Sequence, residues 1–158
     1  MNPYASAVRA LGRTRPFAWV ASRVLHRIDL RVPLSSAGTG FPVAYVTATG
    51  RRSGEPRTVP LLYADWEDDS IVVAATNWGK ATHPAWALNV DAKPDVLVAT
   101  TGRPRPMRAR RAVEEERPEA WRRLERIWPG YAGYRRRAGR DIPVFVLEPE
   151  ARPARRRG

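Results

Sequence analysis

Short strand-like runs separated by tight turns constrain the fold of this chain more than any other feature of its sequence. Runs rich in Val, Ile, Tyr and Thr cover residues 41–49, 57–64, 70–77, 96–100, 106–113 and 142–147. Turns of a few residues join several neighbouring runs, so consecutive strands are expected to pair antiparallel. Pro60 interrupts the second run and favours an edge position for it. The pattern predicts an antiparallel sheet of about six strands that can close into a small barrel.

Helical patterns separate these runs into groups. The predicted helices, some with apolar residues spaced three to four apart, cover residues 16–28, 82–93, 117–128 and 130–137. The fold class is therefore α+β, mainly β, with helices flanking the sheet. A chain of 158 residues is expected to build one main core. The predicted regions are an N-terminal amphipathic helix region, a barrel domain and a basic disordered tail, at residues 1–32, 33–149 and 150–158.

The composition excludes several kinds of chemistry. The chain contains no cysteine, and its two histidines, His26 and His83, lie far apart in the sequence. Disulfides, thiolate zinc sites and cysteine nucleophiles are therefore excluded, and no metal site is expected. No Walker loop, dinucleotide-binding glycine motif or serine-hydrolase elbow is present. No apolar run reaches roughly 18 residues and arginines interrupt the N-terminal apolar stretch, which favours a cytoplasmic protein without a signal peptide.

The positive charge of the chain implies an anionic partner. The net charge is +12, divided as +5 over residues 1–32, −2 over 33–102, +4 over 103–126 and +5 over 127–158. The middle of the predicted barrel is therefore slightly acidic, which is not the basic stripe expected of a duplex-binding protein. The basic helix predicted over 16–28 carries Trp19 and is suited either to packing on its own domain or to peripheral contact with the anionic inner face of a membrane.

One basic turn stands out within the acidic middle region. The sequence from Gly50 to Arg57 reads Gly-Arg-Arg-Ser-Gly-Glu-Pro-Arg and lies between two predicted strands. Gly50 and Gly54 allow positive φ angles and a close approach of backbone N–H groups to a ligand. The arginines can bind phosphate or carboxylate oxygens in a forked geometry, and Ser53 adds a hydroxyl donor. The turn predicts an anion-binding site, although an exposed hairpin with solubilising arginines has the same composition.

Two further segments suit a flat ligand. Small residues follow the third strand over residues 75–89 and precede a helix N-terminus, which leaves space for a ring near a positive helix dipole. Trp86 in this segment fits a core position as well as a ligand contact.

Aromatic residues recur every third position at Trp128, Tyr131 and Tyr134, with two intervening glycines that favour mobility. Such a segment can act as a lid that excludes water, or can pack at the edge of the core.

These three elements, in this order, resemble the deazaflavin-dependent nitroreductase family, whose members are split β-barrels that use reduced coenzyme F420. The matching stretches are residues 47–61, 83–89, 129–134 and 140–149, within a resemblance that spans about residues 17–149. The resemblance implies a fold like the FMN-binding split barrel. It also implies an F420H2-dependent oxidoreductase of the quinone reductase or nitroreductase type, which transfers hydride to a quinone-like or nitroaromatic acceptor.

The resemblance also implies residue roles. The phosphate and anionic tail of the cofactor would be held by Gly50, Arg51, Arg52, Ser53, Gly54 and Arg57. The deazaflavin rings would be flanked by Thr58, Val59, Pro60, Ala75, Thr76, Asn77, Ala85, Trp86 and Asn89. The hydrophobic acceptor would be bound by Trp19, Trp128, Tyr131 and Tyr134. Tyr131, Tyr134 and Thr76 are the candidates for a hydrogen bond or proton relay to the acceptor, because hydride transfer itself needs no protein acid or base.

Three alternatives remain open at this level. A split-barrel oxidoreductase that uses FMN would need a similar phosphate site. A non-catalytic nucleic-acid-binding protein would use the net charge and could stack bases on the Trp and Tyr side chains, but no nucleic-acid motif is present and no nucleic-acid partner is expected. A barrel that stores the cofactor or associates with membranes without turnover would retain the same anion-binding turn.

Overall fold

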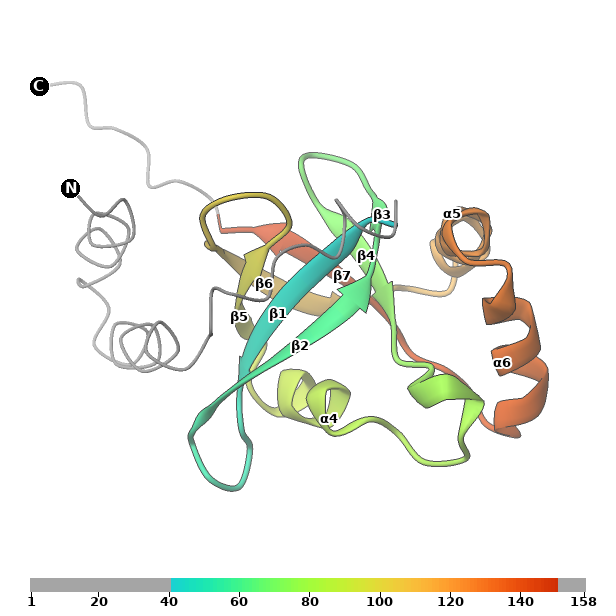
Figure 1. The fold of residues 1–158 in the computed structure, drawn as a ribbon, viewed down its shortest axis with the longest axis horizontal. Coiled ribbons are helices and arrows are strands. Elements are labelled where there is room, and N and C mark those ends of the chain that lie inside the picture. Colours follow the sequence, from blue (N-terminus) through green and yellow to red (C-terminus); the bar gives the residue numbers. More distant parts are fainter. Residues whose placement is uncertain (1–40, 151–158) are drawn as a thin grey trace, which may run out of the picture.

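The structure is a computed structural model that describes residues 41–150. The helix predicted over residues 16–28, with Trp19, and nearly all of the predicted basic tail lie outside the described residues. The described part contains the whole of the predicted sheet and the other predicted helices, and Figure 1 shows its arrangement.

Seven antiparallel strands form one curled, half-barrel sheet (Figure 1). The strands are β1 (Val43–Thr49), β2 (Pro56–Leu62), β3 (Ala64–Asp65), β4 (Ile71–Ala74), β5 (Asp95–Ala99), β6 (Arg105–Arg111) and β7 (Val144–Pro149). Their order across the sheet is β2-β1-β5-β6-β7-β4-β3. The predicted mainly β fold with one antiparallel sheet is confirmed. The strand that carries Pro60 lies at an edge, where a residue without an N–H breaks no ladder on its open side.

The second predicted strand is in fact two strands. Residues 57–64 were expected to form one run, but β2 ends at Leu62 and the next residues leave its partner β1. The two-residue β3 pairs with β4 instead, with Ala64 opposite Val72. This one segment of the chain therefore forms both edge strands of the curled sheet, β2 and β3. For this reason the sheet has seven strands where six were predicted.

Three helices cover parts of the sheet. They are α4 (Ala85–Ala92), α5 (Arg117–Ile127) and α6 (Gly130–Ala138). In Figure 1, α4 lies below the sheet beside the β1–β2 hairpin, whereas α5 and α6 lie to its right. Pro94 follows α4 by two residues and Pro129 separates α5 from α6, as expected for residues that disfavour a continuing helix before them. The predicted helices within the described residues are confirmed.

The side chains form two core clusters on the two faces of the sheet. The first core cluster contains Ala44, Val46, Ala48, Ile71, Val73, Ala75, Trp86, Ala87, Val90, Val96, Val98, Met107, Ala109, Phe145 and Leu147. The second core cluster contains Ala64, Val72, Ala74, Ala112, Ala120, Trp121, Leu124, Tyr131, Ala138, Ile142, Val144 and Val146. The alternation of side chains along β4 and β7 divides their residues between the two clusters. Helix α4 therefore packs on one face, and α5 and α6 pack on the other.

Nothing in residues 41–150 forms a membrane-spanning helix, since α5, the longest helix there, has 11 residues. Within the same residues, no group of three or more His, Asp and Glu side chains could hold a metal ion.

Candidate functional site

The basic turn between β1 and β2 has a defined backbone geometry. The N–H of Gly50 donates to the carbonyl of Glu55 at 2.7 Å, and the N–H of Gly54 donates to the carbonyl of Gly50 at 2.8 Å. Gly54 adopts a positive φ of 70°, as predicted. Gly50 is needed for a different reason, because a Cβ there would lie 2.6 Å from the Ser53 hydroxyl oxygen. The turn is a closed loop whose exposed side carries Arg51, Arg52 and Ser53.

Helix α4 holds this turn in place. The N–H of Arg51 donates to Oδ1 of Asn89 at 3.0 Å, and Asn89 is only 7% exposed. The Ser53 hydroxyl oxygen accepts the N–H of Glu55 at 3.2 Å, which leaves the hydroxyl proton available to a ligand. The backbone N–H groups of Arg52 and Ser53 form no hydrogen bond with another described residue. The turn therefore offers two backbone donors and one hydroxyl donor beside three arginines.

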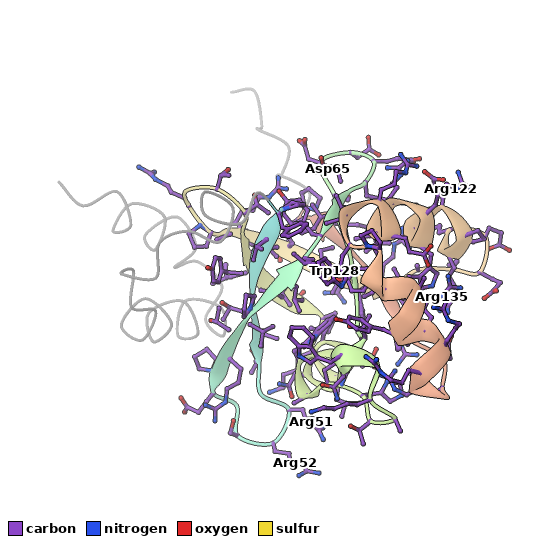
Figure 2. All side chains as sticks on the ribbon, turned by 45° about the vertical axis from the view of Figure 1, so that its right-hand side comes forward. Arg51, Arg52, Asp65, Arg122, Trp128 and Arg135 are labelled. Carbon is purple, nitrogen blue, oxygen red and sulfur yellow. The ribbon has the colours of Figure 1, made fainter. Side chains whose placement is uncertain are left out.

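The arginines of the turn differ from most others in their pairing. Six of the nine arginines in residues 103–126 form ion pairs with carboxylates. Within residues 41–150, no carboxylate forms an ion pair with Arg51, Arg52 or Arg57. Figure 2 shows Arg51 and Arg52 extending from the hairpin at one end of the molecule, away from the paired Arg122 on α5. The positive charge of the turn is thus available to an anionic ligand.

The side chains of β2 divide between its two faces. Val59 and Leu61 pack against the first core cluster, whereas Leu62 packs against the second. Because side chains alternate along a strand, Thr58 and Pro60 share the face of Leu62. The Thr58 hydroxyl forms a 2.8 Å hydrogen bond with the hydroxyl of Thr47 on β1. A flat ligand on this face would therefore meet Thr58 and Pro60, while Val59 lies behind them.

Other predicted ring-flanking residues divide in the same way. Ala75 and Trp86 belong to the first core cluster, and Trp86 packs on Phe145 with ring centroids 5.5 Å apart. Ala85 is exposed at the start of α4. Thr76 is buried, lies two residues after the end of β4 and is the N-cap of the turn that follows.

The loop that follows β4 has an unusual conformation. The 3₁₀ helix η1 (Asn77–Gly79) contains three consecutive residues with positive φ, at 47°, 59° and 75°. Two of them carry side chains, and this conformation costs a non-glycine residue about 1–3 kcal/mol. The side-chain amide of Asn77 donates to the Thr82 carbonyl at 2.9 Å, and Trp78 is 72% exposed. Strain of this kind persists only where surrounding contacts enforce it.

The predicted aromatic lid is helix α6 and the residue before its N-cap. Tyr131 is buried, with its ring 6.3 Å from that of Trp121 and 5.9 Å from that of Tyr134. Burial, with a smaller contribution from Tyr134, raises the pKa of Tyr131 to about 12. Trp128 and Tyr134 are half-buried and pack against the second core cluster. Tyr134 and Trp128 are therefore the more accessible members of the segment.

Helix α6 contacts the loop after β4. The ring of Tyr134 lies 6.3 Å from that of Trp78, and Arg137 donates to the Trp78 carbonyl at 2.7 Å. The guanidinium of Arg140, which follows α6, bonds to four carbonyls of residues 75–82. The structure thus brings together two of the predicted elements, the post-β4 loop and the aromatic segment. The third, the basic turn, is joined to them through β2 and α4.

Sequence analysis missed three residues of this arrangement: Trp78, Arg137 and Arg140. The glycine directly after Trp78 could have singled out this residue, because glycine marks turns. The contacts of the two arginines could not be read from local spacing, since their partners lie 57 to 65 residues away in the sequence.

The curled antiparallel sheet and its flanking helices give the chain the split-barrel-like fold of F420-dependent reductases. A solved structure described as an F420-H2 dependent reductase has 36% sequence identity and a TM-score of 0.62, covering 68% of this chain and 94% of its own. A second solved chain, described as a domain-swapped dimer, has 32% identity and a TM-score of 0.64, covering 84% and 99%.

The chain belongs to the F420H(2)-dependent quinone reductase family, whose model matches residues 24–149. Its relatives include the F420H(2)-dependent quinone reductase Rv1261c of Mycobacterium tuberculosis, which is 30% identical over 129 residues, 77% of this chain and 79% of the relative. Rv3178 of the same organism, provisionally named as such a reductase, is 30% identical over 116 residues, 71% of this chain and 97% of the relative. The predicted resemblance to F420-dependent oxidoreductases is confirmed, and the family's cofactor is F420.

Proposed function

We propose that this chain holds F420H2 through the basic turn and reduces a quinone-like acceptor beside the aromatic helix α6. The observation that carries the proposal is the unpaired charge of Arg51, Arg52 and Arg57 on a turn that α4 holds in place. Within residues 41–150, seven of the thirteen other arginines pair with carboxylates, whereas this turn keeps three arginines for an anion. Family membership supports F420 as this anion.

The residues of the turn fit the anionic part of this cofactor. Phosphate and carboxylate oxygens accept forked hydrogen bonds from arginine, and each such charge-assisted bond is stronger than a neutral one. The backbone N–H groups of Arg52 and Ser53 and the Ser53 hydroxyl supply further donors at the same place. The hydrogen bonds of the Gly50 and Gly54 N–H groups keep the turn closed.

The ring system would lie on the face of β2 that carries Thr58 and Pro60. This face continues to Leu62 and the second core cluster, to which Trp128 and Tyr134 are packed. Thr76 and Asn77 would border the ring on the side of β4, and Ala85 on the side of α4. Val59, Ala75 and Trp86, which belong to or pack against the first core cluster, would support this wall from behind.

Bound F420H2 supplies the hydride, so the residues of the chain need only orient the reactants and exclude water. Tyr131 is protonated at neutral pH even with the ordinary tyrosine pKa of 10.0, and burial raises its pKa further, to about 12. It therefore cannot act as a base there, although its O–H can donate a hydrogen bond. Tyr134 and Thr76 are the other donors proposed for the acceptor oxygen, and Trp128 is proposed to cover the acceptor.

The proposal is tested by titrating the purified chain with F420 and following cofactor fluorescence. We expect the double variant R51A/R52A to bind F420 at least roughly tenfold more weakly, because two charge-assisted contacts are removed. Parallel titrations with FMN and with duplex DNA at low and physiological salt distinguish the alternative partners. Oxidation of F420H2 by quinones and by nitroaromatic compounds then identifies the acceptor class.

The matched control is R126A/R136A, which removes two exposed arginines that also form no ion pair within residues 41–150. It lowers the net charge by the same amount and should leave F420 affinity unchanged. Equal weakening in both double variants would show that only overall charge matters, and would refute the role of the turn.

We propose two finer features on the basis of the sequence. The basic segment over residues 16–28, with Trp19, would bring a cytoplasmic enzyme into peripheral contact with an anionic membrane, where hydrophobic quinones reside. Nitroaromatic compounds would be alternative acceptors at the same site. Sedimentation of the chain with vesicles rich in anionic lipid tests the first feature, and the acceptor panel tests the second.

A further inference from the structure

The loop from Ala75 to His83 depends on contacts from outside itself. Its own backbone contributes only two turn hydrogen bonds, from the N–H of Gly79 to the Thr76 carbonyl at 2.9 Å and from Lys80 to Asn77 at 3.0 Å. Three consecutive residues of this loop, Asn77, Trp78 and Gly79, have positive φ. The Asn77 side-chain amide adds internal bonds to the Thr82 carbonyl and hydroxyl, at 2.9 and 3.2 Å. Two non-glycine residues with positive φ still need a restraint from outside the loop to persist.

The guanidinium of Arg140 provides that restraint. Its Nε donates to the Lys80 carbonyl at 3.1 Å, and its Nη2 donates to the carbonyls of Ala75, Thr76 and Thr82 at 3.1, 3.3 and 3.1 Å. Its Nη1 lies 3.1 Å from Nδ1 of His83. A single side chain therefore holds the beginning, the middle and the end of the loop.

The charge of Arg140 is directed at backbone dipoles and not at an acid. Within residues 41–150, no carboxylate forms an ion pair with Arg140, and the neighbouring Asp141 pairs with Arg117 at 2.5 Å. The arginine is thus not part of a surface salt-bridge network. Its planar fork of donors matches several carbonyls at once, whereas a lysine presents three donors from one point and cannot reach both ends of the loop.

The loop held by Arg140 borders the proposed ring site. Thr76 and Asn77 belong to it, and Trp78 at its tip meets Tyr134 of α6. Arg137 adds one further bond, to the Trp78 carbonyl at 2.7 Å. The loop is therefore fixed from the helix that carries the aromatic residues.

We propose that Arg140 is a positioning residue, which holds the strained loop after β4 in the conformation that receives the deazaflavin ring. The proposal rests on the proposed function for the identity of the ligand. Arg140 does not itself contact the cofactor. It acts by keeping Thr76 and Asn77 at the wall of the site, so its loss should loosen the loop first and weaken the cofactor as a consequence.

The test begins with hydrogen exchange on the cofactor-free protein. In R140K, we expect the amides of Gly79 and Lys80 to exchange at least roughly tenfold faster than in the wild type, while the amides of β1 and β2 keep their protection. The matched control is R136A, on α6, whose arginine makes no hydrogen bond or ion pair with a described residue. It should show wild-type exchange at every position.

Cofactor binding and chemical rescue complete the test. We expect R140K and R140A to bind F420 roughly tenfold more weakly. Added guanidinium ion should restore part of the affinity of R140A but leave R136A unchanged, and sodium at the same ionic strength should restore nothing. Because rescue requires the planar cation itself, a general loss of folding would not produce it. If R140A does not fold, hydrogen exchange and F420 titration of R140K alone test the proposal.

Two results would overturn the proposal. Wild-type protection of Gly79 and Lys80 in R140K would show that Arg140 does not hold the loop. Weak cofactor binding with full loop protection would show that Arg140 contacts the ligand directly. Failure of the wild-type chain to bind F420 would refute the proposed function instead, while the exchange experiment, made without cofactor, would still decide the contribution of Arg140 to the loop.

Discussion

The hydrogen bond between the basic turn and α4 gives the sharpest prediction. Oδ1 of Asn89 accepts the Arg51 N–H at 3.0 Å, and no other hydrogen bond joins this turn to α4 within residues 41–150. Asn89 is 7% exposed, so water does not readily replace the lost acceptor. The substitution N89A therefore tests whether the placement of the turn matters to cofactor binding as well as to folding.

The expected magnitude follows from the bond. A neutral hydrogen bond contributes about 1 kcal/mol, and a donor left without a partner costs about 1–3 kcal/mol when it is buried. The Arg51 N–H lies at the edge of an exposed turn, so we expect the unfolding free energy of N89A to fall by about 1–2 kcal/mol. If the turn must be ordered to hold the anion, the same loss weakens F420 binding by about five- to thirtyfold.

The variant N89D separates the two effects. Its carboxylate still accepts the Arg51 N–H, and the positive turn offsets part of the cost of burying the charge, so N89D should be more stable than N89A. Its negative charge lies beside the backbone of the basic turn, however, and opposes an anionic ligand by about 1 kcal/mol. Urea unfolding measures the first quantity and fluorescence titration with F420 the second. Wild-type affinity in both variants would refute the argument, as would a stability of N89D as low as that of N89A.

Three further predictions concern the loop after β4 and the aromatic helix. In G79A, a methyl group at φ 75° would lie 3.0 Å from the Tyr134 Cα, so we expect thermal unfolding to show a loss of about 1–3 kcal/mol, and wild-type stability would contradict this. In W78G, glycine adopts φ 59° without cost, so the same measurement should show stability unchanged or raised by about 1 kcal/mol, and a clear loss would mean that the exposed ring packs productively. Burial raises the pKa of Tyr131 from 10.0 to about 12. Between pH 10 and pH 12 the folded chain keeps this proton and the unfolded chain loses it, so stability falls as the pH rises through this range. Urea unfolding should therefore show wild type losing about 1.4 kcal/mol more than Y131F between pH 9 and pH 11, and equal losses would place the hydroxyl in water.

Much of the fold could be predicted from local patterns. The strands follow from alternating or continuous β-branched runs, and Pro60 correctly indicated an edge strand. The helix of residues 130–137 was predicted and extends to Ala138, where Gly139 in the left-handed region ends it. The split of the second run into β2 and β3 could not be predicted, because it depends on the curl of the sheet. That curl brings Ala64 to Val72 instead of to β1.

The candidate site was predictable in its residue types but not in its contacts. The glycine-bounded turn was evident because three arginines stand in an acidic region. Asn89, which holds this turn, is 38 residues from Arg51 in the sequence, so no local spacing pattern predicts their hydrogen bond. The contacts of Arg140 could not be predicted for a related reason, although this residue opens the matching stretch 140–149. It is one of 28 basic residues, and only the tertiary structure distinguishes an arginine that meets four carbonyls from one that meets solvent.

The place of β7 in the sheet has a consequence for the order of folding. β7 follows every other strand in the chain, yet it lies between β6 and β4 and pairs with both. The β3–β4 pair therefore gains its connection to the rest of the sheet only when residues 144–149 arrive. Until then β6 and β4 both expose open edges, which are prone to association with other chains. The sheet is therefore completed in one long-range step, in which β7 inserts between β6 and β4.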